Sequence, residues 1–135
     1  MIKQVIVMRK DLHMRRGKEI AQGSHSSMMF LIHAIKDYNT SQAGNEFPED
    51  TSEFSLTDIQ QQWIDGLFTK VCLQVNSEEE LLEIHRKALS VGLESHLIQD
   101  AGKTEFGGVP TYTCLAIGPD DSEKIDLITG NLKLY

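Results

Sequence analysis

The sequence lacks the features that place a protein in a membrane or outside the cell. None of its apolar runs approaches the roughly 20 residues that span a bilayer. Residues 1–8 (MIKQVIVM) do not show the order of basic region, apolar region and cleavage site that marks a signal peptide. We therefore expect a cytoplasmic protein with no membrane-embedded part.

Cysteine is also scarce. Cys72 and Cys114 are the only two, and each lies in an apolar run typical of a β-strand. We expect buried free thiols, because a disulfide is unusual in the cytosol. The histidines show no Cys/His spacing typical of zinc ligands. We therefore expect neither a metal nor a cofactor.

An excess of basic charge is missing as well. The net charge of −7 argues against a general nucleic-acid binder, and we expect no binding to DNA. The distribution is uneven, however, because residues 3–18 hold six Lys and Arg and a single acid, Asp11, while acids gather at 46–58, 78–83 and 120–126. One end of the molecule can therefore be locally positive, although these residues can equally be ordinary solvated charges.

The length of 135 residues fits one domain. Apolar runs predict strands at 2–8, 69–75, 94–99 and 111–117, the first covered on both faces. Helical spacing predicts helices at 18–38, 57–65, from 77 to Gly92 and at 119–129, with an extended tail at 131–135. Two capping boxes, Thr57 with Gln60 and Ser77 with Glu80, mark the starts of the second and third helices. The second strand, its helix and the third strand form a right-handed crossover unit, and the last two strands can pair antiparallel. The predicted fold is a three-layer α/β/α domain with a small four-stranded mixed sheet.

The predicted first helix carries two stripes at steps of three and four residues. We expect one stripe to be buried, and it comprises Ile20, Ser24, Ser27, Met28, Leu31 and Ile35. The other begins with Lys18, Gln22 and His25 and continues with Met29 and Ile32. A stripe that is polar first and apolar later suits a helix whose beginning lines a cleft, although a partly exposed helix end has the same pattern. Free N–H groups near Gly17 can bind a phosphate or an oxyanion.

The second candidate site is the loop that follows the third strand. Asp100 ends that strand, where sites of α/β proteins tend to lie. Thr104 and Thr111 add two hydroxyls, and three glycines allow sharp turns. The same residues can instead serve only the turn. No G-x-S-x-G motif and no cysteine in a polar setting supplies a nucleophile, so a hydrolase here would use a positioned water.

Four segments together resemble one protein family. Residues 11–25 (DLHMRRGKEIAQGSH), 97–104 (LIQDAGKT), 111–119 (TYTCLAIGP) and 128–134 (ITGNLKL) resemble, in this order, the motifs of archaeal/eukaryotic-type (type 2) peptidyl-tRNA hydrolases. The resemblance runs from residue 2 to the end of the chain apart from the acidic loop at 39–55. It therefore covers the predicted domain, 1–135, with that loop as an insertion.

The resemblance implies hydrolysis of the ester between a peptide and the tRNA 3′ end, which recycles tRNA from abortive translation. It also implies a four-stranded mixed sheet between helices, usually in a homodimer. By motif position, it places the following residues in the active site: Lys18, Gln22, His25, Asp100, Thr104 and Thr111. We expect an ion pair between Lys18 and Asp100. We expect the following cations to bind tRNA phosphates: Arg9, Lys10, Arg15, Arg16 and Lys103.

The sequence departs from the family pattern at a few points. Gly23 stands where the family often has Cys or another small residue, and Arg16 stands where it has a second lysine. The loop after Thr104 is one residue longer, and the acidic loop at 39–55 is longer than is typical. Two other hypotheses stay open: a non-catalytic module that binds tRNA or a protein, and a hydrolase of another ester or amide.

Overall fold

The computed structural model describes residues 1–44 and 54–135. Its elements follow the predicted order: β1 (Ile2–Arg9), α1 (Arg16–Gln42), α2 (Asp58–Asp65), β2 (Lys70–Val75), α3 (Glu78–Ser90), β3 (Ser95–Asp100), β4 (Thr111–Asp121) and α4 (Ser122–Thr129). Most of the predicted acidic loop, residues 45–53, lies outside the described residues. Its first part was predicted wrongly, because α1 continues to Gln42 rather than ending at 38.

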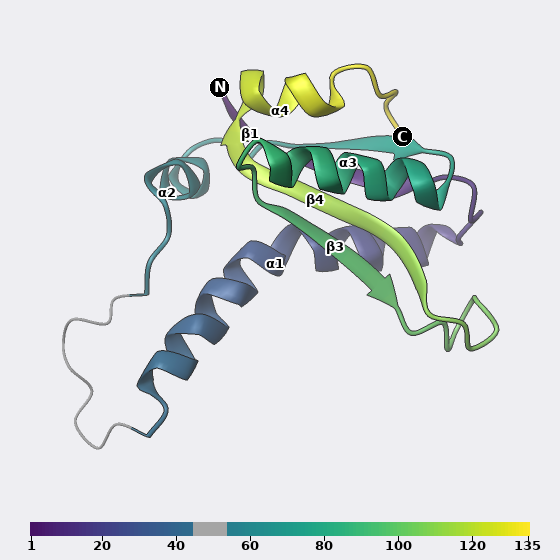
Figure 1. Ribbon diagram of the computed structural model, residues 1–135, viewed down its shortest axis with the longest axis horizontal. Helices are drawn as coiled ribbons and strands as arrows, with labels where there is room; N and C mark the ends of the chain where they lie inside the picture. The colour runs from purple at the N-terminus through teal and green to yellow at the C-terminus, as the bar shows by residue number, and fades with distance from the viewer. Residues whose placement is uncertain (45–53) are drawn as a thin grey trace.

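The four strands form one mixed sheet in the order β2-β1-β4-β3. β1 pairs parallel with β2 and antiparallel with β4, and β4 pairs antiparallel with β3, as expected for the last two strands. β2 and β3 are therefore parallel and lie at opposite edges, so the connection through α3 crosses the whole sheet (Figure 1). The carboxyl ends of β1, β2 and β3 therefore lie at the same end of the strands. We call this end the carboxyl edge of the sheet, as distinct from its lateral edges.

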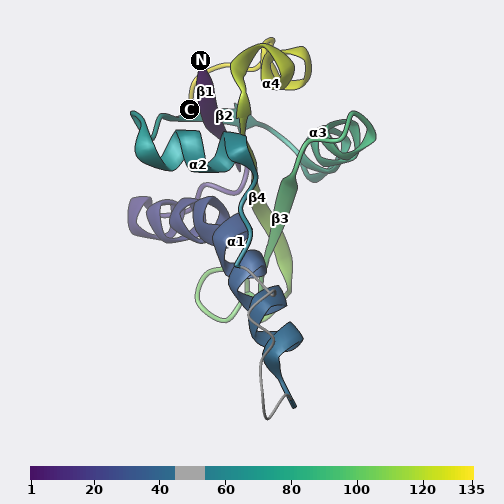
Figure 2. The ribbon, with the colours of Figure 1, turned by 90° about the vertical axis from the view of Figure 1, so that its left-hand side faces the viewer.

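Helices cover both faces of this sheet, which confirms the predicted three-layer architecture. α1 and α2 lie on one side and α3 and α4 on the other (Figure 2). Alternate side chains of β1 enter two separate cores. Val5 and Val7 pack with Leu81 of α3 and Ile125 of α4, while Met8 packs with residues beneath α1.

The buried face of α1 differs from the prediction. Ile20, Met28 and Ile35 are 63%, 54% and 42% exposed, so the expected apolar stripe does not lie in the core. The buried residues of this helix are instead Gly23, Ser26 and Phe30. Small side chains allow the helix to lie close to the sheet, and the second half of α1 extends past the sheet (Figures 1 and 2).

The other helix signals were reliable. Thr57 and Gln60 form the predicted reciprocal capping box of α2, and Gly66 ends the helix. Ser77 accepts a hydrogen bond from the Glu80 N–H, but the Glu80 carboxylate bonds the N–H of Asn76, so the second predicted box is only half formed.

At the end of the chain, β4 continues to Asp121, so α4 begins three residues later than predicted. The extended tail then pairs with the free edge of β2, where the Gln74 and Tyr135 N–H groups bond carbonyls of Lys133 and Cys72. Within the described residues, no helix is long and apolar enough to cross a bilayer.

Candidate active site

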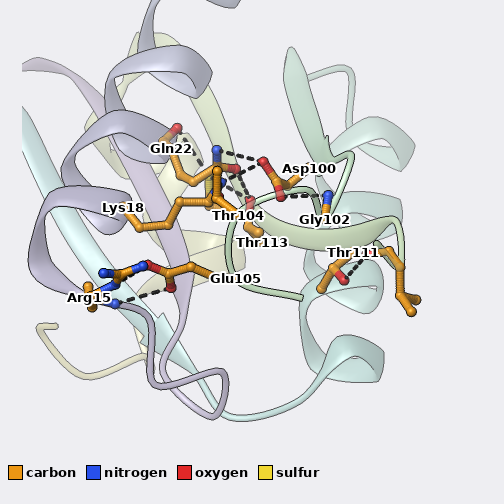
Figure 3. A network of polar contacts seen from close by, with 11 residues as sticks. Arg15, Lys18, Gln22, Asp100, Gly102, Thr104, Glu105, Thr111 and Thr113 are labelled. Atoms are coloured by element: carbon orange, nitrogen blue, oxygen red, sulfur yellow. Dashed lines mark hydrogen bonds and ion pairs between the residues drawn. The ribbon is translucent and has the colours of Figure 1, made fainter. Parts of the chain in front are cut away.

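The two candidate regions of the sequence meet at the carboxyl edge of the sheet. α1 begins there after β1, and β3 ends there at Asp100. Lys18 extends from the first turn of α1, and its Nζ lies 2.8 Å from Asp100 Oδ1 and 3.0 Å from Thr104 Oγ1 (Figure 3). The expected ion pair is thus present, and the Lys18 and Asp100 side chains are each 15% exposed.

Three donors surround the Asp100 carboxylate and leave room for a further hydrogen bond. Oδ1 accepts from Lys18 and, weakly at 3.5 Å, from Gln22 Nε2. Oδ2 accepts from the Gly102 N–H at 2.8 Å, which closes a turn of the chain on itself. The Lys18 hydrogen bond, with the Gly102 N–H, lowers the pKa of Asp100 below its usual value against the opposing effect of burial. Asp100 therefore serves both the turn and the ion pair, and stays ionised at neutral pH.

Glycine is required at position 102. Its φ is +80°, in the left-handed region, and an added Cβ would lie 2.1 Å from the Val109 carbonyl oxygen. The Gly108 N–H also bonds the Gly102 carbonyl at 2.8 Å, which folds loop 101–110 back on itself. This close approach of backbone to backbone sets the direction of the chain between Asp100 and Thr104.

The sequence analysis missed Thr113, which lies in β4 and is fully buried. Its hydroxyl donates to Gln22 Oε1 at 2.5 Å. A carboxylate only accepts hydrogen bonds, so Gln22 must present its Nε2 to Asp100 and its Oε1 to Thr113. Thr113 thereby fixes the orientation of the Gln22 amide. No sequence signal marks Thr113, because threonine is an ordinary residue of a strand.

Two of the predicted site residues lie outside this cluster. The Thr111 hydroxyl donates to the Val109 carbonyl within its own loop. His25 is exposed on α1 and has no hydrogen bond or ion pair with the part of the chain that the structure describes. Lys18, Gln22, Asp100 and Thr104 are brought together, whereas the roles predicted for His25 and Thr111 stay predictions.

The predicted phosphate-binding cations differ in their surroundings. Arg9 is largely buried, with Nη2 2.7 Å from Asp11 Oδ2 and Nη1 donating to the Tyr112 carbonyl. The Arg9 guanidinium holds the pKa of Asp11 below its usual range. The N–H donors of the Arg9 guanidinium are therefore already engaged by Asp11 and the Tyr112 carbonyl.

The other four cations lie at the surface. Arg15 is 81% exposed, although it pairs with Glu105, and Lys10 lies 5.6 Å from the centre of the Tyr135 ring. Arg16 and Lys103 are exposed. These four side chains come from the two segments that carry Lys18 and Thr104. Their positive charges therefore lie on residues next to the cluster in the sequence.

Two hollows lie along α1. One, of about 600 Å³, lies against the second half of the helix and is lined by residues such as Phe30, Tyr38 and Glu94, away from Lys18. The other, of about 370 Å³, is mostly apolar and lies between α1 and the strands β1 and β2, beside Glu19 and Tyr135. The described ranges, 1–44 and 54–135, contain no His, Cys, Asp and Glu cluster that could hold a metal ion. The polar cluster lines neither of these two hollows.

Comparison with known proteins gives matches along the whole chain. The chain is 43% identical over 135 residues to a peptidyl-tRNA hydrolase of Nanoarchaeum equitans, with all of both chains covered. It is 41% identical over 133 residues to that of Methanocaldococcus jannaschii and 40% identical over 133 residues to that of Methanothermobacter thermautotrophicus. Each of these alignments covers 98% of this chain and 99% of the relative.

A sequence model of one family, described as peptidyl-tRNA hydrolase PTH2, matches residues 2–135. This match includes the four motifs on which the resemblance rests, and it confirms that resemblance. The residues that meet at the carboxyl edge of the sheet, Lys18, Gln22, Asp100 and Thr104, come from the first two of those motifs. The chain therefore belongs to the PTH2 family of peptidyl-tRNA hydrolases.

Proposed function

We propose that the protein hydrolyses the ester bond between a peptide and the 3′ end of tRNA, and so recycles tRNA from abortive translation. Membership of the PTH2 family supports this reaction, since the relatives are named peptidyl-tRNA hydrolases. The observation that carries the mechanism is the 2.8 Å contact between Lys18 Nζ and Asp100 Oδ1. An ammonium and a carboxylate side by side supply an electrophilic group and a group that can hold water.

Lys18 is the proposed stabiliser of the oxyanion. Its ammonium has three N–H donors. Asp100 and Thr104 take one each, and no side chain or carbonyl among the described residues takes the third. That donor is available to the ester carbonyl oxygen as negative charge develops there. Removal of one oxyanion donor costs about 10²–10³ in turnover in enzymes studied by mutation.

Asp100 is the proposed partner of the attacking water. Its lowered pKa keeps the carboxylate ionised but makes it a weak base, so it acts mainly by orienting the water and receiving its proton as the bond to the carbonyl carbon forms. Thr104 accepts a second hydrogen bond from the ammonium, at 3.0 Å. Gln22, itself oriented by Thr113, adds a hydrogen bond to the carboxylate. We keep His25 and Thr111 as groups that contact the peptide or the terminal adenosine.

The exposed cations are the proposed contacts to tRNA phosphates. Lys10, Arg15, Arg16 and Lys103 lie on the two segments that carry the cluster, although the chain as a whole is acidic. We expect Arg9 to contribute less than the others to phosphate binding, because Asp11 and the Tyr112 carbonyl already engage its guanidinium. Affinity for tRNA should fall as salt rises, since each phosphate contact releases counterions.

Cleavage of a blocked substrate tests the proposal. The protein is incubated with N-acetylaminoacyl-tRNA and, separately, with the unblocked aminoacyl-tRNA, and release of free tRNA is measured. Cleavage of the blocked form alone is the expected result. Binding of tRNA without cleavage would instead indicate a non-catalytic module, and cleavage of unrelated esters or amides a hydrolase of another class.

The homodimer implied by the family resemblance and a cytoplasmic location complete the proposal. The exposed apolar side chains of α1, Ile20, Met28 and Ile35, offer one helix face that a second copy can cover. Sedimentation equilibrium at micromolar concentration distinguishes a dimer from a monomer. Substitution of Met28 by Glu should weaken association if this face is the interface.

A further inference from the structure

Glu105 contacts the start of α1 from the loop between β3 and β4. Its Oε1 lies 2.8 Å from Arg15 Nε, and its Oε2 accepts the Arg15 backbone N–H at 3.3 Å. The two side chains face each other beside Lys18 and Thr104 (Figure 3). Although Glu105 is a charged loop residue, its side chain is only 14% exposed, while that of Arg15 is 81% exposed.

This contact also places a negative charge at the start of α1. Arg15 is the N-cap residue of α1, and its side chain makes no capping hydrogen bond. The Glu105 carboxylate, which approaches from 90 residues away, lies at this helix end. Negative charge is favourable at the start of a helix because of the unpaired N–H groups and the helix dipole. Loop and helix are therefore joined by charge as well as by hydrogen bonds.

The neighbours of Glu105 both contact Lys18. Thr104 accepts a hydrogen bond from its Nζ at 3.0 Å, and the Phe106 ring centre lies 5.9 Å from the same atom. Three consecutive loop residues thus contact the first turn of α1. The backbone hydrogen bonds within the loop run from Gly108 to Gly102 and from Val109 to Phe106, so they fold the loop but do not tie it to α1.

We propose that Glu105 is a positioning residue for the hydrolysis: by binding Arg15 it holds loop 101–110 against α1 and thereby keeps Thr104 on the Lys18 ammonium. This inference rests on the proposed function of the cluster. Glu105 makes no hydrogen bond or ion pair with Lys18 or Asp100, so its effect passes through Thr104. A second consequence concerns Arg15: its Nε is held by Glu105, while its Nη groups make no hydrogen bond with the described residues and can bind a phosphate.

The test compares Glu105→Ala, Glu105→Gln, Thr104→Ala and the Thr104→Ala/Glu105→Ala double variant. The substrate is N-acetylaminoacyl-tRNA, and kcat and KM are measured separately. Glu105→Ala should lower kcat about 10- to 100-fold, because small misplacements of a catalytic group cost that much. Glu105→Gln should recover part of kcat, since its single amide oxygen still accepts one of the two hydrogen bonds from Arg15 although the charge is lost. The kcat of the double variant should be no lower than that of the slower single variant, because both changes remove the same contact, that of Thr104 with the Lys18 ammonium.

A second measurement is independent of activity. Amide hydrogen exchange at Gly102 and Gly108, whose N–H groups bond Asp100 and the Gly102 carbonyl, should accelerate in Glu105→Ala, while β1 amides stay protected. Glu83→Gln is the matched control, because it removes the carboxylate of another surface ion pair, with Arg86 on α3, and should change neither readout.

The outcomes separate this inference from the proposed function. Three results would each overturn the positioning role of Glu105. They are a kcat of Glu105→Ala within twofold of the parent, unchanged amide hydrogen exchange in the loop, and kcat losses of Glu105→Ala and Thr104→Ala that add up in the double variant. A parent protein that leaves the blocked substrate intact would refute the proposed function. In that case the exchange at Gly102 and Gly108 still decides whether Glu105 holds the loop.

Discussion

Lys18 and Asp100 are separated by 82 positions in the chain, and their charged groups are 2.8 Å apart. Each is supplied by an element end: Lys18 by the first turn of α1, Asp100 by the last residue of β3. The parallel strands β1 and β3 bring these ends to one edge of the sheet. The fold thus creates the ion pair without any local sequence signal linking the two residues.

Removal of either charge should abolish most of the activity. Lys18→Ala and Asp100→Ala should each lower kcat by about 10²–10³, since an oxyanion donor or the water-holding group is lost. Lys87→Ala, which removes an exposed lysine of α3, is a control and should leave kcat unchanged. Cleavage of N-acetylaminoacyl-tRNA under single-turnover conditions measures the effect. If both site variants keep nearly full activity, the assignment of Lys18 and Asp100 is wrong.

The ionisation of Asp100 should depend on Lys18. The lowered pKa of this carboxyl means that its stabilising contribution is present above about pH 4, the usual range for Asp, and is lost as the pH falls through the lower value of the folded state. In Lys18→Ala the pKa of Asp100 should rise. A ¹³C NMR titration of the Asp100 carboxyl in both proteins measures this, and an unchanged titration would show that Lys18 is not the cause.

The order of strands and helices could be predicted because each element carries its own signal. Residues 2–8 and 111–117 are apolar, Thr57 and Gln60 cap α2, and glycines end three of the helices. The face of α1 could not be predicted in the same way. Its large apolar residues form a regular stripe, yet Gly23 and Ser26 are the residues pressed on the sheet. Periodicity counts large side chains and overlooks small ones that permit close packing.

The site was predictable in part for a related reason. Residues at the ends of elements, such as Lys18 and Asp100, are conspicuous by spacing and by position after a strand. Thr113 lies inside β4, where a threonine is an ordinary strand residue. Its partner Gln22 is 91 positions away, so only the packing of α1 against β4 reveals the hydrogen bond. Sequence reasoning therefore selected Thr111, which begins the same strand and is the more accessible of the two.

The two threonines should respond differently to the loss of their hydroxyl groups. Thr113→Val leaves Gln22 Oε1 without its donor in a buried setting, which costs about 1–3 kcal/mol and frees the amide that contacts Asp100. We expect about 10-fold lower kcat, from a contribution near 1.4 kcal/mol. Thr111→Val removes only a bond to the Val109 carbonyl and should keep kcat within a fewfold. An equal decrease of kcat in the two variants would indicate that Thr111 also acts in catalysis.

The thiol of Cys114 should resist alkylation in the folded protein. The residue is fully buried beneath α1, and burial raises the pKa of its thiol to about 11. At pH 8 only about one molecule in 10³ carries the reactive thiolate. Treatment with iodoacetamide followed by mass spectrometry should show Cys72, which is half-buried, modified before Cys114. Labelling of both thiols at one rate in the native state would contradict the described packing, whereas in denaturant both should react.

Two glycines of loop 101–110 can show whether a close backbone contact or a positive φ controls the position of the loop. Gly102 and Gly107 both have positive φ, so alanine at either position costs about 1–2 kcal/mol of backbone strain. Only at Gly102 would the new Cβ meet the Val109 carbonyl, at 2.1 Å, whereas nothing lies within 4 Å of it at Gly107. Gly102→Ala must therefore shift the loop, weaken the N–H bond to Asp100 and move Thr104 away from Lys18. We expect kcat to fall at least about 10-fold in Gly102→Ala and to stay near the parent value in Gly107→Ala. Melting temperatures measured beside kcat separate unfolding from misplacement, and equal kcat losses in the two variants would mean that strain alone, rather than the Gly102–Val109 contact, governs the loop.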